Sequence, residues 1–391
     1  MCRNVCGHGR IAFLECFRRG TRLDRSVGAF RWAPRKGGGA LRAFSMHGES
    51  VESFELSPSK ERDRLLQGRI ADFGLKVEGT RLAQLIQRLY DELETGGIKL
   101  RPPVYLSDEW GCPDRVPIIG VPFYLADEKL IRIEDEMRDG VEAESDEEIL
   151  RYLRHETGHV FNYAYKLFET EAWHQLFGPY ARPYIDEYTP APFSHDFVRH
   201  LPGWYAQKHP DDDFAETFAV WLTPNSNWRE AYRDWGCYPK LLYVDGVVQT
   251  HGATEPLVTP EGYDTAEEAL RRSLADHYER LRDPIVEVPP YLDAALRDIF
   301  EAPSKSTKSG SKSSPATAFI RSHHRAISTA IIYWTGLNDA AVRALLRHVQ
   351  ERCGQMKLRH HGDDQNALAE LVVFITVLCM NKLYKGDFIC R

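Results

Sequence analysis

Residues 145–168 read SDEEILRYLRHETGHVFNYAYKLF, and this stretch predicts a long helix with a well-defined start. Ser145 followed three residues later by Glu148 is the pattern of a capping box. Asp146 and Glu147 add negative charge to the first turn, where it complements the helix dipole. We therefore expect a helix over residues 146–168.

The same helix carries the sequence HETGH, which is typical of a zinc site. His155 and His159 are four residues apart, so they lie on one face about 6 Å apart and can reach one ion. A catalytic zinc keeps three protein ligands and leaves the fourth position to water. Glu156 lies one step round the helix, where it can meet that water as a general base. The alternative is a pair of surface histidines on an amphipathic helix.

Gly158 lies between the two histidines. Glycine lowers helix stability by about 1 kcal/mol relative to alanine. Its presence inside a helix with a strong start therefore indicates close packing near the metal.

A third ligand must come from elsewhere in the chain. The extended motif HExxHxxGxxH is not present, because Asn162 and Tyr165 stand where its glycine and third histidine would be. A second helix is predicted over residues 211–222, and its Glu216 is the favoured ligand, giving a His₂Glu site. The other candidates considered are His195, His200, His209 and Asp213.

Asp213 has two further interpretations. With Glu216 three residues later it forms the pattern of an ordinary capping box. It is also a candidate acceptor for the N–H of a ligand imidazole, the partner that zinc histidines normally have.

The rest of the chain predicts an α+β fold, in which a small sheet precedes the motif helix. Hydrophobic spacing predicts a helix over residues 80–94, and residues 178–210 lack periodicity and are expected to be irregular. Strands are expected at 104–106, 116–125 and 129–133, a hairpin at 241–248 around Asp245 and Gly246, and helices at 266–281, 291–300, 338–353 and 365–380.

Composition divides the chain into four parts. Residues 1–45 are rich in Arg and Gly and are expected to be a disordered basic segment, either a flexible arm or sequence upstream of a start at Met46. Residues 46–302 form the main domain, residues 303–315 are a Ser/Lys linker, and residues 316–391 form a small helical domain.

Charge and cysteine content favour a cytoplasmic protein. The net charge is −7, of which residues 1–45 hold +8, so the remainder carries −15 and no nucleic acid is expected as a partner. The eight cysteines include no CxxC pair and no dense framework, which suits a reducing compartment. The longest apolar run, residues 371–380, is shorter than a membrane span and is expected to be a buried helix.

Several segments resemble the zinc-binding metallopeptidases of bacteria that look like gluzincins. They are YLRHETGHVFNYAY at 152–165, RPYIDEY at 182–188, SHDFVRHLPGWYAQKHPDDDFAETFAVWL at 194–222, and residues 235–238. The resemblance implies a zincin-like core with zinc held by His155, His159 and Glu216 and with Glu156 catalytic.

The expected function is hydrolysis of peptide bonds by a zinc-activated water, with one zinc per chain and a peptide or protein as substrate. Tyr205, His195 and His200 precede Glu216 and are candidates to donate a hydrogen bond to the developing oxyanion. Two alternatives use the same residues. One is a zinc-containing binding or regulatory protein on this fold, and the other is a hydrolase of a non-peptide amide.

Overall fold

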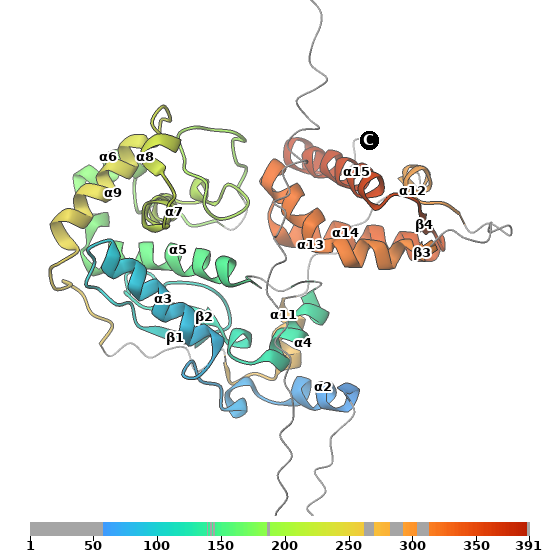
Figure 1. The fold of residues 1–391 in the computed structure, drawn as a ribbon, viewed down its shortest axis with the longest axis horizontal. Coiled ribbons are helices and arrows are strands. Elements are labelled where there is room, and N and C mark those ends of the chain that lie inside the picture. The colour runs from blue at the N-terminus through green and yellow to red at the C-terminus, as the bar shows by residue number, and fades with distance from the viewer. Residues whose placement is uncertain are drawn as a thin grey trace, which may run out of the picture. The chain divides into compact units, whose positions relative to one another are not determined.

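The computed structural model describes residues 58–138, 140, 143, 145–185, 188–261, 270–281, 292–302 and 313–388 (Figure 1). The predicted basic segment 1–45 and residues 303–312 of the predicted linker lie outside the described residues. The helices of the first part are α2 Pro58–Gln67, α3 Arg81–Thr95, α4 Glu128–Arg138, α5 Asp146–Ala164, α6 Glu171–Phe177, α7 Pro210–Leu222, α8 Trp228–Ala231, α9 Tyr238–His251 and α11 Leu274–Arg280. The later helices are α12 Asp293–Ile299, α13 Ala316–Thr335, α14 Asp339–Gln355 and α15 Asp364–Lys385.

A small parallel sheet precedes α5, as expected. Strand β1, Val104–Ser107, pairs with β2, Ile119–Pro122, and Val104 lies opposite Ile119. Gly111 adds an antiparallel bridge to Gly120. The predicted strand over residues 116–125 is shorter in the structure, because a 3-10 helix, Phe123–Ala126, follows β2 directly. The described residues are mostly helical with two small sheets, which is a broad α+β class.

The strand predicted at residues 129–133 is wrong, because these residues begin α4. Their short apolar pattern also fits a helix, since Leu130 and Ile133 are three residues apart and both are buried. Asp127 accepts hydrogen bonds from the backbone N–H groups of Lys129 and Leu130 and so starts the helix.

The hairpin predicted at residues 241–248 is also wrong, because these residues lie inside α9. Leu241, Val244 and Val248 are buried at helical spacing. Asp245, expected in a turn, instead accepts hydrogen bonds from Trp221 and Arg229. Side-chain packing here overrides the turn preference of Asp-Gly.

Helix α5 begins as predicted, and both hydrogen bonds of the Ser145–Glu148 capping box are present. The helix ends at Ala164 rather than at residue 168. It packs against α7 so closely that a Cβ on Gly158 would lie 2.6 Å from Ala215 Cα. The expectation that Gly158 serves close packing is therefore confirmed.

The C-terminal residues form three long helices, and their apolar core also includes Leu296 and Phe300 from before the predicted linker. Residues of α13, α14 and α15 share one buried apolar cluster, which includes Ile331, Leu345 and Leu371. Strand β3, Ser313–Pro315, falls at the end of the predicted linker and pairs with β4, Arg359–His361.

Helix α15 is only partly buried, unlike the prediction for residues 371–380. Leu371 and Ile375 are enclosed, whereas Val373 and Val377 are exposed. Among the described helices α15 is the one long and apolar enough, by length and composition, to cross a membrane. One such helix on a packed bundle is compatible with a soluble protein.

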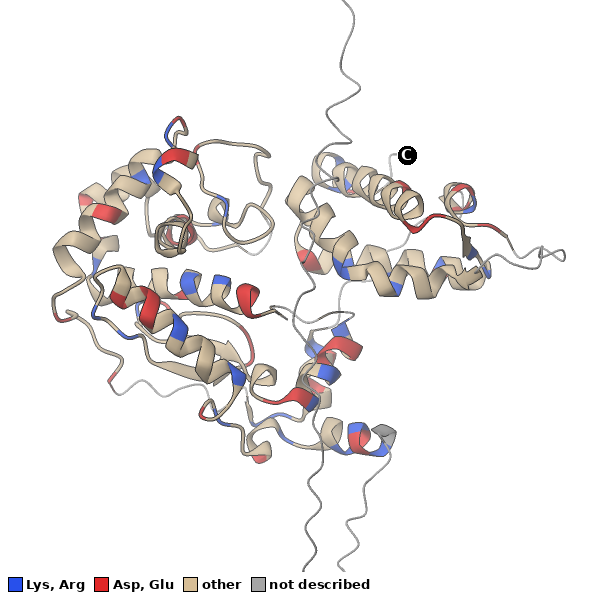
Figure 2. Cartoon of the chain, in the orientation of Figure 1, with Lys and Arg blue, Asp and Glu red and all other residues tan. Residues whose placement is uncertain are grey.

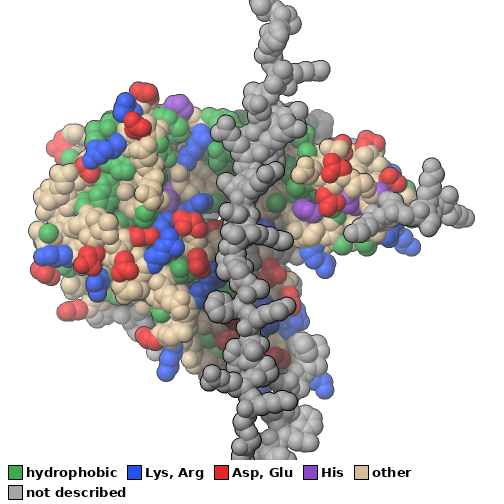
Figure 3. Space-filling model, in the orientation of Figure 1, with side chains coloured by type: hydrophobic (Ala, Val, Ile, Leu, Met, Phe, Trp, Pro, Cys, Tyr) green, Lys and Arg blue, Asp and Glu red, His purple; other side chains and the backbone are tan. Residues whose placement is uncertain are grey.

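Charges are mixed over the described residues. Figure 2 shows Lys and Arg interspersed with Asp and Glu along the helices, and Figure 3 shows the same mixture on one face of the molecule.

Candidate metal centre

Three side chains from α5 and α7 converge on one point. His155 Nε2 lies 3.1 Å from His159 Nε2, and Asp212 Oδ1 lies 3.6 Å and 3.5 Å from these two nitrogens. A tetrahedral ion with bonds of about 2.1 Å separates its ligand atoms by about 3.4 Å. The three residues are buried and could hold a metal ion.

The other ring nitrogen of each histidine faces a carboxylate. His155 Nδ1 lies 2.8 Å from Glu216 Oε1, and His159 Nδ1 lies 2.8 Å from Asp211 Oδ2. An ionised carboxylate only accepts hydrogen bonds, so each Nδ1 carries the proton. The Nε2 lone pairs of both rings are therefore left to point at the same place, which is the arrangement a metal ion requires.

Electrostatics favour a cation at this point. Burial alone would lower the pKa of His155, but hydrogen bonds to Asp212 and Glu216 raise it to about 9. Burial also opposes a charge on His159, and Asp211 and Asp212 outweigh it and raise the pKa of that ring. The surrounding acids thus stabilise positive charge between the rings. A metal ion would provide this charge while both ligand rings stay neutral.

Glu156 lies beside this group without belonging to it. Its side chain is buried, and burial is the main reason that its pKa is raised above 4.5; the negative charges of Asp211 and Asp212 act in the same direction. A carboxylate with a raised pKa is a better proton acceptor, as a general base must be.

The structure gives Glu216 a different place from the one expected. Its Oε1 accepts the N–H of His155 and its Oε2 accepts the backbone N–H of Leu201. Both oxygens are therefore engaged on the far side of the His155 ring. Asp212, which sequence reasoning did not select, joins His155 and His159 in the group that could hold a metal ion.

Asp213 is a candidate partner of a ligand imidazole, but in the structure it pairs with Lys240. Asp213 Oδ2 lies 2.6 Å from Lys240 Nζ, and both side chains are almost completely buried. Burial raises the pKa of Asp213 to about 7 in spite of this lysine. The residue that does accept from an imidazole is the neighbouring Asp211.

The three other histidines considered as ligands have separate partners. His195 stacks on Trp235 with ring centroids 4.2 Å apart. His200 Nε2 lies 2.9 Å from the carbonyl oxygen of Arg151, and His209 caps α7 by accepting the backbone N–H of Asp211. None of the three belongs to the group formed by His155, His159 and Asp212.

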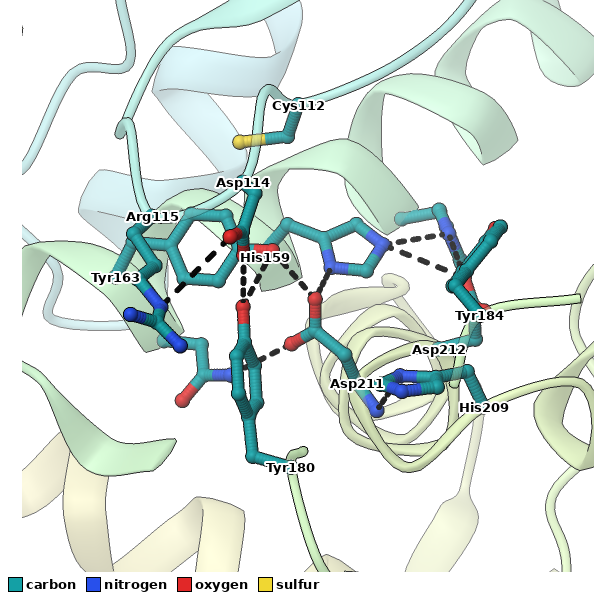
Figure 4. Close-up of polar contacts among 12 residues, drawn as sticks. Cys112, Asp114, Arg115, His159, Tyr163, Tyr180, Tyr184, His209, Asp211 and Asp212 are labelled. Carbon is teal, nitrogen blue, oxygen red and sulfur yellow. Dashed lines mark hydrogen bonds and ion pairs between the residues drawn. The ribbon is translucent and has the colours of Figure 1, made fainter. Parts of the chain in front are cut away.

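A buried network holds Asp211. Its carboxylate accepts hydrogen bonds from His159, from the hydroxyl of Tyr163 and from the amide of Asn162 (Figure 4). Tyr180 extends the network, because its hydroxyl donates to Asp114 and lies 3.3 Å from the hydroxyl of Tyr163. Asn162 stands where the longer zinc motif would have glycine, and here it has a role of its own because it fixes the partner of a candidate ligand.

Tyr205 lies next to the candidate metal position. Its ring meets that of His155 edge to face, with centroids 5.3 Å apart. Its hydroxyl lies 3.5 Å from Tyr184 Oη and 3.5 Å from Lys208 Nζ. Burial is the main cause of a raised pKa for Tyr205, so its phenol stays protonated and able to donate.

Comparison with known proteins finds no match to the chain among family models, curated proteins or solved structures.

Proposed function

We propose that this chain is a zinc-dependent hydrolase of peptide bonds, with zinc held by His155, His159 and Asp212. The observation that carries the proposal is the direction of the two imidazoles: Glu216 and Asp211 take up both Nδ1 atoms, and both Nε2 atoms converge with Asp212 Oδ1. Two neutral imidazoles and one carboxylate form a donor set that zinc accepts in tetrahedral geometry.

A catalytic role is favoured because three protein ligands leave one coordination position of the zinc open. Bound there, zinc would polarise a carbonyl group and lower the pKa of a water molecule. Glu156, adjacent in sequence to the first proposed ligand, would take a proton from this water and return it to the leaving amine. Its raised pKa suits both the acceptance and the return of a proton.

Tyr205 is the proposed donor to the oxyanion that develops on the substrate. It is the one predicted candidate that contacts a ligand ring, since His195 stacks on Trp235 and His200 is bonded to Arg151. Because its phenol is protonated, it can donate without first taking up a proton.

The test is peptide cleavage by the full chain loaded with zinc. A mixture of unstructured peptides is incubated with wild type and with Glu156→Gln, and new termini are counted by mass spectrometry. We expect wild type to cleave and Glu156→Gln to be slower by a factor of 10² or more. Equal cleavage by both proteins, or none by zinc-loaded wild type, would overturn the proposal.

A further inference from the structure

A cavity of about 330 Å³ lies beside the first half of α5. Its lining includes Arg151 and Arg154 of α5, Arg199 and Trp204 of the following irregular segment, and Thr329 and Tyr333 of α13. Nothing in the proposed catalytic chemistry uses these side chains. The cavity is large enough for a small organic group.

The cavity carries an excess of positive charge. Arg154 is neutralised, because it makes two hydrogen bonds to Glu92 and one to Glu147. No ion pair joins Arg151 or Arg199 to an acid within the described part of the chain. Two uncompensated guanidinium groups in one cavity stand out in a chain whose net charge is −7.

Arg199 is held by aromatic rings, which leaves its terminal N–H groups available. Its guanidinium carbon lies 4.2 Å from the centre of the Trp204 ring and 5.4 Å from that of Trp235. Contacts of this kind engage the guanidinium without using its N–H groups. The Nε atom of Arg199 is fully enclosed and has no hydrogen-bond partner among the described residues.

Trp204 supplies a second enclosed donor. Its indole Nε1 is buried and likewise has no acceptor among the described residues. A buried N–H without an acceptor destabilises the fold. Both donors belong to residues that line the cavity, but both nitrogen atoms are enclosed by protein, so the groups that a ligand can reach are the terminal N–H groups of Arg151 and Arg199.

We propose that this cavity binds an organic carboxylate with an apolar body. A guanidinium matches the two oxygens of a carboxylate, and Arg151 and Arg199 supply two guanidinium groups without an acidic partner among the residues that the structure describes. The apolar body would face Leu201, Pro202 and the ring of Tyr333, which also line the cavity.

The position of the cavity relates it to the candidate metal centre. Arg151 lies four residues before His155, which is one turn along the same helix face. Leu201 lines the cavity and donates its backbone N–H to Glu216, the partner of His155. In the proposed hydrolase the cavity would hold an acidic group of the substrate. This assignment rests on the proposed function, whereas the binding of a carboxylate in the cavity is independent of it.

The probes are N-acetyl-L-phenylalanine and its neutral amide, titrated calorimetrically into the full chain. We expect the acid to bind at least tenfold more tightly than the amide. Arg151→Gln and Arg199→Gln should each weaken the acid at least tenfold. Arg233→Gln removes an exposed arginine that pairs with Glu230, and it should leave binding unchanged.

The Asp212→Ala variant separates the cavity from the metal, since it removes a proposed zinc ligand and leaves the cavity intact. Undiminished binding of the acid to Asp212→Ala supports the cavity even if the chain cleaves no peptide. Equal affinity for acid and amide, loss of binding in Asp212→Ala, or full binding by both Arg151→Gln and Arg199→Gln would overturn the proposal. Tighter binding of inorganic phosphate than of the acid in the same calorimetric titration would replace the carboxylate with a phosphate ligand and also overturn the proposal.

Discussion

Substituting Gly158 by alanine tests whether the contact between α5 and α7 sets the metal site. The added Cβ would lie 2.6 Å from Ala215 Cα and 2.8 Å from its carbonyl oxygen, whereas ordinary contact begins at 3.4 Å. The difference between 3.4 Å and 2.6 Å requires the helices to separate by about 0.8 Å. Metal sites tolerate changes in ligand distance of only about 0.2 Å. Asp212 lies three residues from Ala215, so it moves with this part of α7.

Two effects on stability oppose each other in Gly158→Ala. Alanine stabilises a helix by about 1 kcal/mol relative to glycine, and overpacking costs about 1–3 kcal/mol. We therefore expect the free energy of unfolding to be unchanged or lowered by up to about 2 kcal/mol. Zinc affinity should fall at least tenfold, because Asp212 is displaced from the two histidines.

The matched control is Gly246→Ala in the exposed interior of α9, where a Cβ meets nothing within 4 Å. It should gain up to about 1 kcal/mol in stability and leave zinc affinity unchanged. Urea unfolding measures the first quantity and competition with a chelator the second. If Gly158→Ala gained stability as Gly246→Ala does and kept the zinc affinity of wild type, the argument from helix contact would be refuted.

Three further outcomes follow from the site and its surroundings. Asp211→Asn should weaken zinc binding about 10–100-fold in chelator competition, because the amide is a poorer acceptor for the His159 N–H; unchanged affinity would show that Asp211 does not orient the ligand. Tyr205→Phe should lower kcat for peptide cleavage about 10²–10³-fold with zinc content unchanged, and loss of zinc from this variant would instead make Tyr205 structural. Burial lowers the pKa of His277 from 6.5 to about 4, so its contribution to stability is complete above pH 6.5 and is lost as the pH falls toward 4. Urea unfolding between pH 4 and pH 7 should therefore show a shallower loss of stability in His277→Gln than in wild type, and equal slopes would contradict this.

The parts of the fold that could be predicted are those with strong local signals. The start of α5 follows from Ser145 and Glu148, and the buried face of α3 follows from leucines at helical spacing. The errors occur where a short apolar pattern fits both a helix and a strand. Residues 129–133 and 241–248 are helical because their apolar side chains pack in the core, which no local pattern reveals.

The sequence could not predict that Asp212 joins His155 and His159, and the reason is geometric. Asp212 and Glu216 are four residues apart, so both face α5 and both are acidic. Which of them reaches the Nε2 side of His155 and which the Nδ1 side depends on where the two helices cross. That crossing is set by the contact of Gly158 with Ala215, a tertiary feature.

The most direct test of the metal centre is zinc per chain by elemental analysis after dialysis, on folded wild type, Glu156→Gln, Glu216→Gln and Asp212→Ala. We predict about one zinc in wild type and Glu156→Gln and clear loss in Asp212→Ala. Glu216→Gln should retain zinc with weaker affinity, since Glu216 only orients His155. Wild type without zinc, or Asp212→Ala with its full complement, would contradict the assignment of His155, His159 and Asp212 as the ligands.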